Sequence, residues 1–428
     1  MTWRSSVGLV LVAAGTTVLL LTHRTDYTTL YPALLASAVG LWLARDVPLG
    51  YALSVGAALR VLAVTLPALL SDDYFRFLWD GRLWLAGYHP LAFVPRAATP
   101  GFAEANAELL AGMNSAGYFT VYPPVSQLAF ALSAAFAKTT GAGLVLLKAL
   151  LLVGEAAVGA LLYRLDASAG RRGLALYALC PLVVVEVCGN AHFESLAVLG
   201  LLAAVWGFRQ NRPWVSGVGL GFGVLTKLVP ALAGPELLLA WGWRREGNGG
   251  WRWASALRFA LAAAATSGLG MFAFLSPVAW SGFGESLDLY FRSFEFNGSL
   301  YAVAAELGAW YKGWNWIAVV GPGLSVVAVL GILAVSAYGA YRRWRLAETL
   351  LWCFAVWLAC ATTVHPWYAI YLVALGALTP YRWPWVLSFA VFVSYLAYGQ
   401  DPVAVPGWAL GVEYGVVVGV MVWEGVWR

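Results

Sequence analysis

Charged side chains are scarce in this sequence. Asp, Glu, Lys and Arg account for 11% of the 428 residues, whereas hydrophobic residues account for 61%. An average soluble domain uses roughly 25% charged residues to cover its surface. This scarcity excludes a soluble domain of appreciable size and predicts an integral membrane protein.

Cysteine motifs and nucleotide-binding motifs are also lacking. The cysteines lie in apolar runs without a CxxC pair, so they are expected to be small core residues: Cys180, Cys188, Cys353 and Cys360. We find no GxxxxGKS/T, no GxGxxG after a strand and no HExxH, so ATP-driven, dinucleotide-dependent and zincin chemistry lack their motifs. No basic run with interleaved aromatics indicates a nucleic-acid partner. The energy for a reaction would have to come with the substrate.

Long apolar runs dominate what is present and predict an all-α, multi-span helical bundle of about 12–14 transmembrane helices. Several runs are shorter than the ~20 residues that a spanning helix needs, and those broken by Pro or Gly could be re-entrant. The candidate spans lie near residues 6–22, 29–44, 50–70, 143–163, 173–189, 193–208, 214–227, 229–243, 255–279, 315–338, 347–364, 366–380, 384–398 and 408–424. No repeat or low-complexity linker divides the chain, so residues 1–428 are expected to form a single domain.

Arginines between the runs predict the orientation, because short cytoplasmic loops collect Arg and Lys. With a cytoplasmic N-terminus, one side receives Arg4, Arg45, Arg164, Arg171, Arg172, Arg209, Arg212, Arg244, Arg245, Arg252, Arg342, Arg343, Arg345, Arg382 and Arg428. That inner side also has a flexible loop at residues 244–252. The outer side receives a first loop at residues 71–140, whose stretch 125–137 is expected to be a surface helix, a second loop at 281–313, and apices at Asn190, Lys227, His365 and Asp401. We expect the chemistry on this outer side.

The strongest local signal is SDDYFRFLWDGR at residues 71–82. Three carboxylates and two arginines in so short a segment could abstract a proton and hold an anion. These residues are Asp72, Asp73, Asp80, Arg76 and Arg82. The alternative is a helix N-cap with solvated charges, since Asp72 or Asp73 could cap a helix running through Trp84.

Three more outer segments carry candidate residues. His192 and Glu194 lie in the apex GNAHFE, after Glu186 in the preceding run, and carboxylates at membrane depth are functional candidates unless they pair with a residue such as Arg60 or Lys148. Lys227 would place a lone ammonium at an outer turn, where it could bind a phosphate or snorkel to the interface. Aromatic and polar groups that suit a sugar, an isoprenoid phosphate or an ordinary interfacial belt are Tyr122, Arg292, Glu295, Asn297, His365 and Tyr368.

These segments together resemble the GT-C superfamily of polytopic glycosyltransferases, most of all its bacterial mannosyltransferase-type members. The matching pieces are SDDYFRFLWDGRLWLAGYHPL, TVYPPVSQLAF, LYALCPLVVVEVCGNAHFESLAV, LTKLVP, SFEFNGSLY and TTVHPWY. Two departures from the superfamily are an acidic loop that follows the third apolar run, which suggests an extra N-terminal hairpin at residues 1–48, and the lack of a large extra-membrane C-terminal domain.

The resemblance implies an inverting enzyme of a bacterial inner membrane whose active site faces the periplasm or exterior. It would transfer a hexose, with mannose as the family expectation, from a polyprenyl-phosphate-sugar donor to a lipid or glycan acceptor. Its other partners would be membrane lipids, and no nucleic acid is expected. Asp73, or Asp72 after it, would be the base. His192 and Glu194 would form the second polar motif, and donor phosphate contacts would come from Lys227, Arg76 and Arg292. A divalent cation (Mg²⁺ or Mn²⁺) on Asp72 and Asp73 remains open.

Two other classes of function also fit a polytopic protein. A lipid or sugar transporter or flippase would line its route with the charged residues inside the spans, namely Arg60, Lys148, Glu155, Glu186 and Glu236. A non-catalytic envelope assembly protein would tolerate loss of its outer carboxylates. The transferase differs from both because its activity requires an acidic residue in the first outer loop.

Overall fold

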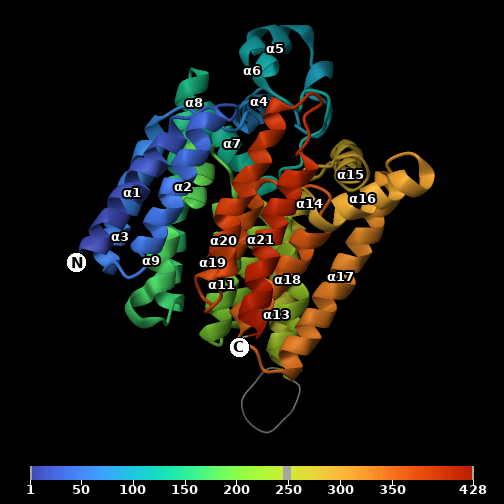
Figure 1. Cartoon of the computed structure of the whole chain (residues 1–428). Helices are drawn as coiled ribbons and strands as arrows, with labels where there is room; N and C mark the ends of the chain where they lie inside the picture. The colour runs from blue at the N-terminus through green and yellow to red at the C-terminus, as the bar shows by residue number, and fades with distance from the viewer. Residues whose placement is uncertain (1, 244–251, 427–428) are drawn as a thin grey trace.

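The computed structural model describes residues 2–243 and 252–426 and is a bundle of helices (Figure 1). In these ranges extended pairing is limited to isolated bridges of Phe296 and Asn297 with Thr363. The all-helical expectation is thereby confirmed. Residues 244–251 of the predicted inner loop at 244–252 and the arginines Arg244, Arg245 and Arg428 lie outside the described residues.

The N-terminal half begins with three helices and then passes through the first predicted outer loop, which is itself helical. The elements are α1 (Trp3–Leu20), α2 (Tyr27–Leu43), α3 (Leu49–Thr65), α4 (Asp73–Leu85), η1 (Pro95–Ala97), α5 (Pro100–Ala105), α6 (Ala107–Gly112), α7 (Pro124–Phe136) and α8 (Thr140–Leu165). Helices α4 to α6 lie at one end of the bundle, away from both chain termini (Figure 1).

The centre of the chain contains a broken helix. Cys180 and Pro181 interrupt the predicted run 173–189, and its two halves are bent by 50°. The central elements are η2 (Ala169–Arg171), α9 (Arg172–Leu179), α10 (Pro181–Val183), the π-helix η3 (Val184–Gly189), α11 (Glu194–Arg209), α12 (Pro213–Thr226), η4 (Val229–Ala233) and α13 (Gly234–Trp243). Proline lacks the N–H that would continue a helix, which explains the break.

The C-terminal half contains the second predicted outer loop, in which helix α16 lies at the edge of the bundle, inclined to α17 (Figure 1). Its elements are α14 (Trp253–Phe274), α15 (Pro277–Arg292), α16 (Ser299–Lys312), α17 (Ile317–Tyr341), α18 (Leu346–Cys360), η5 (Pro366–Tyr368), α19 (Ala369–Gly376), α20 (Trp383–Ala390), η6 (Val391–Gly399) and α21 (Gly407–Val426).

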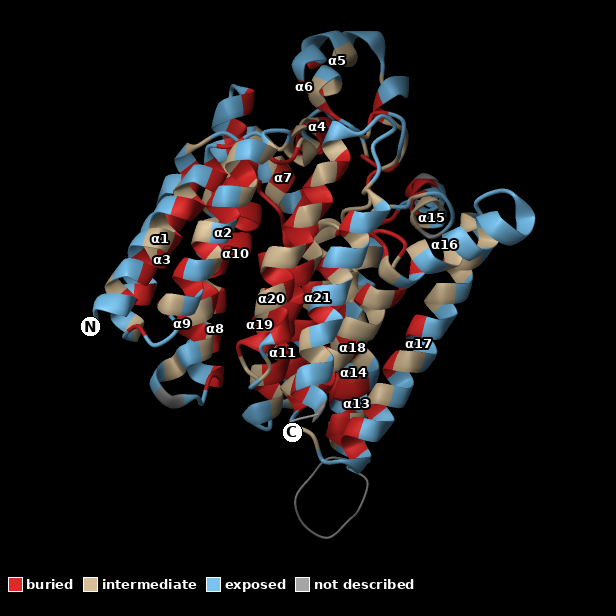
Figure 2. Ribbon diagram, viewed as in Figure 1, coloured by how far each residue is buried: buried red, intermediate tan, exposed pale blue. Residues whose placement is uncertain are grey.

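Several helices are suited to a lipid environment. Four of them, α1, α8, α14 and α17, are long and apolar enough to cross a membrane, and the bent pair Arg172–Leu179 with Pro181–Gly189 can be counted as a fifth span. Seven shorter apolar helices accompany them. The periphery is apolar and exposed (Figure 2), with Phe272 on α14 81% exposed and Leu330 on α17 61% exposed. Exposed apolar surface on this scale indicates contact with lipid, and the chain is an integral, multi-span membrane protein.

The core lies around η3, α11 and α19, where nearly every residue is buried (Figure 2). All four cysteines are buried and free, as the sequence predicted. One ion pair crosses this interior: Nε of Arg60 donates to Glu155 at 3.0 Å, and the same carboxylate accepts from the Tyr177 hydroxyl at 2.9 Å. Lys148 donates to backbone carbonyls at the end of α3. Neither Arg60 nor Lys148 therefore pairs with Glu186 or Glu194, which was the structural alternative for those carboxylates.

Helix α4 is held in place by a close crossing with α7. A Cβ added at Gly81 would lie 2.2 Å from the carbonyl oxygen of Phe130. Non-bonded carbon and oxygen atoms do not approach so closely, so a larger residue would force the two helices apart. The crossing positions the N-terminal end of α4, where Asp72 and Asp73 lie.

We predict that Gly81→Ala destabilises the protein, because overpacking at a tight crossing costs about 1–3 kcal/mol. Thermal unfolding in detergent should show a midpoint lowered by several degrees. Gly159→Ala is the matched control, since a Cβ there would meet nothing within 4 Å. Equal midpoints for the two variants would contradict the importance of this crossing.

Candidate active site

The two adjacent carboxylates of the first outer loop have different partners. Helix α4 begins at Asp73, and Asp72 makes no side-chain hydrogen bond as its N-cap, so the capping alternative is not what the structure shows. Asp72 instead binds Arg24 at 2.5 Å, and the Arg24 guanidinium lies 4.5 Å from the centre of the Tyr398 ring. Asp72 is thereby occupied, whereas Asp73 turns toward the interior.

Asp73 faces a buried histidine. Its Oδ2 lies 3.7 Å from Nε2 of His192, and its Oδ1 accepts weakly from the Asn114 amide at 3.4 Å. The other ring nitrogen of His192, Nδ1, lies 2.9 Å from Oε2 of Glu186. The imidazole also stacks on Trp367, with 3.6 Å between ring centroids. His192 is thus clamped between two carboxylates and one indole.

The local backbone explains how the broken helix presents His192. The π-helix η3 ends at Gly189, and Ala191 adopts φ +64°, a left-handed conformation that costs a non-glycine residue about 1 kcal/mol or more. Asn190 ties the turn to the first outer loop, because its Oδ1 accepts from the backbone N–H of Leu70. π-Helical segments and strained residues are often found at functional sites.

The electrostatics of the pair follow from this packing. Burial alone would raise the pKa of Asp73, but interaction with His192 and, more weakly, the charge of Lys227 lower it to about 2. Burial alone would lower the pKa of His192, yet Asp73 and Glu186 together raise it to about 9. At neutral pH the pair is therefore a carboxylate facing an imidazolium.

A second ion pair lies next to Asp73. Lys227, at the C-terminal end of α12, contacts Glu194, at the start of α11, at 2.5 Å, and its ammonium lies 5.3 Å from the centre of the Tyr122 ring. The expectation of a lone ammonium is thus wrong, although one carboxylate leaves other N–H donors of Lys227 available. Tyr122 is near both acids, since burial and then the charges of Asp73 and Glu194 raise its pKa well above 10.

The apex after α18 forms a wall of aromatic rings. His365 is sandwiched between Phe296 and Trp367, with ring centroids 4.8 Å and 4.4 Å away, and the Tyr368 ring lies edge-on at 5.6 Å. Burial lowers the pKa of His365 to about 4, so the ring is neutral. We use the name outer cluster for the residues that the structure brings together here, which are Asp73, Tyr122, His192, Glu194, Lys227, His365 and Tyr368.

Two other candidates from the first loop form an internal brace. Arg76 donates from Nε to Asp80 at 2.8 Å and from Nη1 to the backbone carbonyls of Ser115 and Tyr118. Asp80 is fully buried and also accepts from the Gln127 amide at 2.9 Å. Arg82 donates to Asn106 at 2.8 Å. These contacts connect α4 to the segment between α5 and α7 and to α7 itself.

The candidates from the second predicted outer loop have side-chain partners that do not belong to the outer cluster. Arg292 pairs with Asp288 at 2.8 Å on the exposed face of α15. Glu295 accepts from the amide of Asn315 at 2.7 Å, and Asn297 donates to Glu413 of α21 at 3.0 Å. The first contact joins the segments that precede and follow α16, and the second fastens the loop to α21.

Three residues near the outer cluster were not selected from the sequence. Arg24 carries a signal that could have found it, because it lies in a polar turn that the predicted orientation assigns to the outer side. Trp367 and Tyr290 carry none, since interfacial belts contain many aromatic residues. Burial and then the charge of Asp73 raise the pKa of Tyr290.

The two carboxylates considered as cation ligands, Asp72 and Asp73, have other partners in the structure. Among the described residues, no three His, Cys, Asp or Glu side chains are grouped so that they could hold a metal ion. Asp72 is bound to Arg24 and Asp73 faces His192. Both carboxylates that could have ligated Mg²⁺ or Mn²⁺ thus face cationic side chains.

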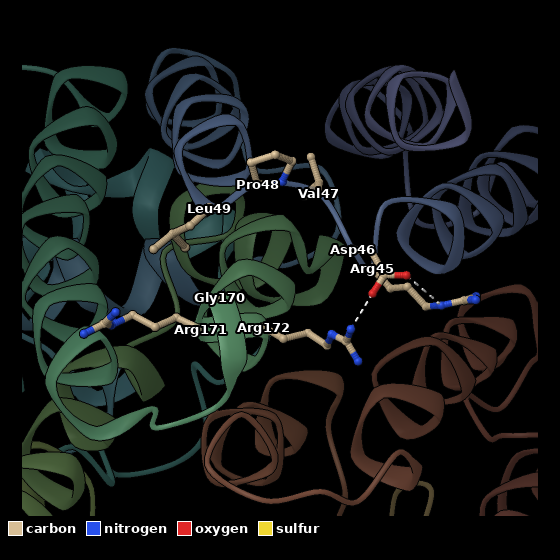
Figure 3. A pocket seen from close by; sticks show the side chains of 8 residues that line it. All are labelled: Arg45, Asp46, Val47, Pro48, Leu49, Gly170, Arg171 and Arg172. Atoms are coloured by element: carbon tan, nitrogen blue, oxygen red, sulfur yellow. Dashed lines mark hydrogen bonds and ion pairs between the residues drawn. The ribbon is translucent and has the colours of Figure 1, made fainter. Parts of the chain in front are cut away.

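A cavity of about 420 Å³ lies at the opposite end of the bundle, between the end of α2 and the start of α9. Figure 3 shows its charged lining, in which Asp46 lies between Arg45 and Arg172, at 3.5 Å and 2.5 Å. This end contains the arginines predicted to be cytoplasmic, and the outer cluster contributes nothing to the cavity.

Comparison with known proteins gives one match. The family described as Glycosyltransferase family 87 matches residues 119–366, more than half of the chain. This range contains Tyr122, His192, Glu194, Lys227 and His365 of the outer cluster, whereas Asp73 and Tyr368 lie outside it. No curated protein and no solved structure gives a significant match.

We predict that Asp73→Asn weakens the pH dependence of stability. The folded-state pKa of His192 is raised to about 9. The protonated ring therefore contributes fully to the free energy of unfolding below about pH 6.5, and this contribution is lost as the pH rises through 9. Removing one of its two carboxylates should reduce that loss. Unfolding midpoints at pH 6 and pH 9.5 measure it, and Asp288→Asn, an exposed residue, is the control. An unaltered difference between the two midpoints would show that Asp73 does not hold the imidazolium.

Proposed function

The chain belongs to glycosyltransferase family 87, a family of the GT-C type, and from this premise we propose that it transfers a hexose from a polyprenyl-phosphate-linked donor. The acceptor is a hydroxyl of a lipid or glycan, and mannose is the first sugar to test. Transfer takes place on the non-cytoplasmic side of a bacterial inner membrane. The observation that carries the proposal is Asp73, a carboxylate in the first predicted outer loop that faces His192 and whose pKa the charge of Lys227 helps to lower.

Asp73 acts as the general base. An acceptor hydroxyl ionises far above pH 7, so a positioned carboxylate that takes its proton accelerates the attack by roughly 10²–10⁴-fold. The acceptor oxygen bonds to the anomeric carbon while the bond from that carbon to the phosphate oxygen breaks. The electron pair stays on the phosphate, and the hydroxyl proton passes to Asp73 and then to the leaving phosphate or to water.

Lys227 stabilises the departing polyprenyl phosphate. Negative charge develops on the phosphate as the bond breaks, and an ammonium placed there lowers the barrier because it interacts most strongly with the transition state. The pairing with Glu194 supports this role, since it fixes the direction of the lysine side chain before the donor arrives. One displacement inverts the anomeric centre, so the product has the opposite anomeric configuration from the donor.

We predict that Asp73→Asn abolishes transfer and that Asp72→Asn has a smaller effect, because Asp72 is bound to Arg24. The assay supplies polyprenyl-phosphate-mannose, or the glucose donor, to the purified protein with a membrane lipid extract, and lipid-linked product is measured. Loss should be at least about 100-fold for Asp73→Asn. Wild-type-like transfer by Asp73→Asn would remove it from the mechanism, and no transfer by the wild type with either donor would favour a transporter or an assembly protein.

The orientation has its own test in cysteine labelling. Ser115→Cys, between α6 and α7, should react with a membrane-impermeant maleimide from outside, and Ser168→Cys, beside η2, only after the membrane is opened. The four native cysteines are buried, so they contribute little background. Labelling of both positions from the same side would overturn the proposed location of the active site.

A further inference from the structure

Glu186 is the fully buried carboxylate of the π-helix η3, and the proposed reaction leaves it without a role. It is nevertheless richly bonded. Oε1 accepts from the Tyr395 hydroxyl at 2.7 Å, while Oε2 lies 3.3 Å from the Asn190 amide and 2.9 Å from Nδ1 of His192. Burying a carboxylate is costly unless hydrogen bonds and an opposite charge compensate it. The Glu186 carboxylate thus has three partners, and the cationic one, His192, also faces Asp73.

Glu186, His192 and Asp73 lie in a row, and their contacts decide which ring nitrogens of His192 carry a proton. Because Glu186 accepts from Nδ1, that nitrogen carries a proton and Nε2 is directed at Asp73. Nε2 is buried and has no hydrogen-bond partner among the described residues. If Nε2 were unprotonated, its lone pair would face the Asp73 carboxylate 3.7 Å away and repel it. The row is stable when His192 is an imidazolium between two carboxylates.

We propose that Glu186 is a positioning residue for the transfer reaction, holding His192 in the charged form that keeps Asp73 ionised and directed at the acceptor hydroxyl. This inference rests on the proposed function, since it assigns Asp73 as the base. Glu186 touches neither sugar nor acceptor. It acts through His192, in the manner of a carboxylate that orients an imidazole in hydrolytic triads.

The groups around His192 set the sign of the pH dependence. Glu186 of η3 and Asp73 of α4 favour the imidazolium, while His365 from the apex after α18 is neutral and Lys227 is a more distant cation. Tyr395 of η6 donates to Glu186, and Trp367 of η5 stacks on the ring. As the pH rises through about 9, Nε2 loses its proton. Activity should therefore have an alkaline limb near pH 9 in the wild type.

Glu186→Gln is the decisive variant. The neutral amide keeps the shape and can still accept from Nδ1, but it removes one of the two charges that hold the imidazolium. We expect the alkaline limb of kcat to move to lower pH, and kcat at pH 8 to fall by roughly 10- to 100-fold, the range for lost outer partners of metal-bound histidines. KM for the polyprenyl-phosphate sugar should change little. In His192→Gln the alkaline limb should disappear because the titrating group is gone.

Glu155→Gln is the matched control. Glu155 is also a buried carboxylate with a tyrosine hydroxyl and a cation as partners, Tyr177 and Arg60, but it lies away from the outer cluster. Its replacement can lower the amount of folded protein, yet it should leave the pH profile of the remaining activity unchanged. A shift of the same size in Glu155→Gln would show that the effect is structural and would overturn the proposal.

A second measurement keeps the proposal independent of the assay. The chain has only four histidines, so selective ¹³C labelling of their ring carbons gives four resonances, and His192→Gln assigns one of them. His192 should titrate near pH 9 in the wild type and lower in Glu186→Gln. Transfer by the wild type with identical titrations and pH profiles in both proteins would overturn the role of Glu186. Absence of wild-type transfer would instead reject the proposed function, and the titration would still report on the row.

Discussion

The contact between His192 and its two carboxylates joins the parts of the chain that form the site. Glu186 comes from the π-helix in the middle of the chain, Asp73 from the start of α4, and the supporting Tyr395 from η6 near the C-terminus. Each of these charges would be unfavourable alone in so buried a position, and together they compensate one another. The break at Pro181, the π-helix and the strained Ala191 all serve to bring His192 between the two acids.

The protein contains two kinds of charge pair, and burial distinguishes them. The pair Arg60–Glu155 is enclosed by helices and satisfied by backbone carbonyls and Tyr177, so it holds α3, α8 and α9 together. The pair Lys227–Glu194 lies in the outer cluster, and Glu194 retains a buried oxygen without a hydrogen bond among the described residues. The free oxygen of Glu194 can accept a hydrogen bond from a hydroxyl, and the N–H donors of Lys227 that do not face Glu194 can bind an anion.

Much of the architecture was accessible from local patterns. Long apolar runs predicted the helices, whereas the run 173–189 was predicted as one span and is broken in the structure at Cys180 and Pro181. Segments spread over residues 71–368 suggested a GT-C enzyme, and the family match over residues 119–366 confirms that class. Local patterns did not predict that many of the helices are shorter than a membrane crossing. Among the described residues four to five candidate spans reach the length of a membrane crossing, and the prediction of about 12–14 transmembrane helices remains a prediction.

The sequence by itself determined that this is a helical membrane protein of a glycosyltransferase family, since composition and short motifs are properties of neighbouring residues. It also placed His192, Glu194 and Lys227 among the candidates. Only the tertiary structure decided the partner of each charge: Asp72 binds Arg24, Asp73 faces His192, and Arg76 turns inward to Asp80. These choices depend on contacts between segments as far apart as Glu186 and Tyr395. The packing of whole helices decides which distant segments come into contact. Asp72 and Asp73 are equivalent in the sequence, and only this packing gives them different partners.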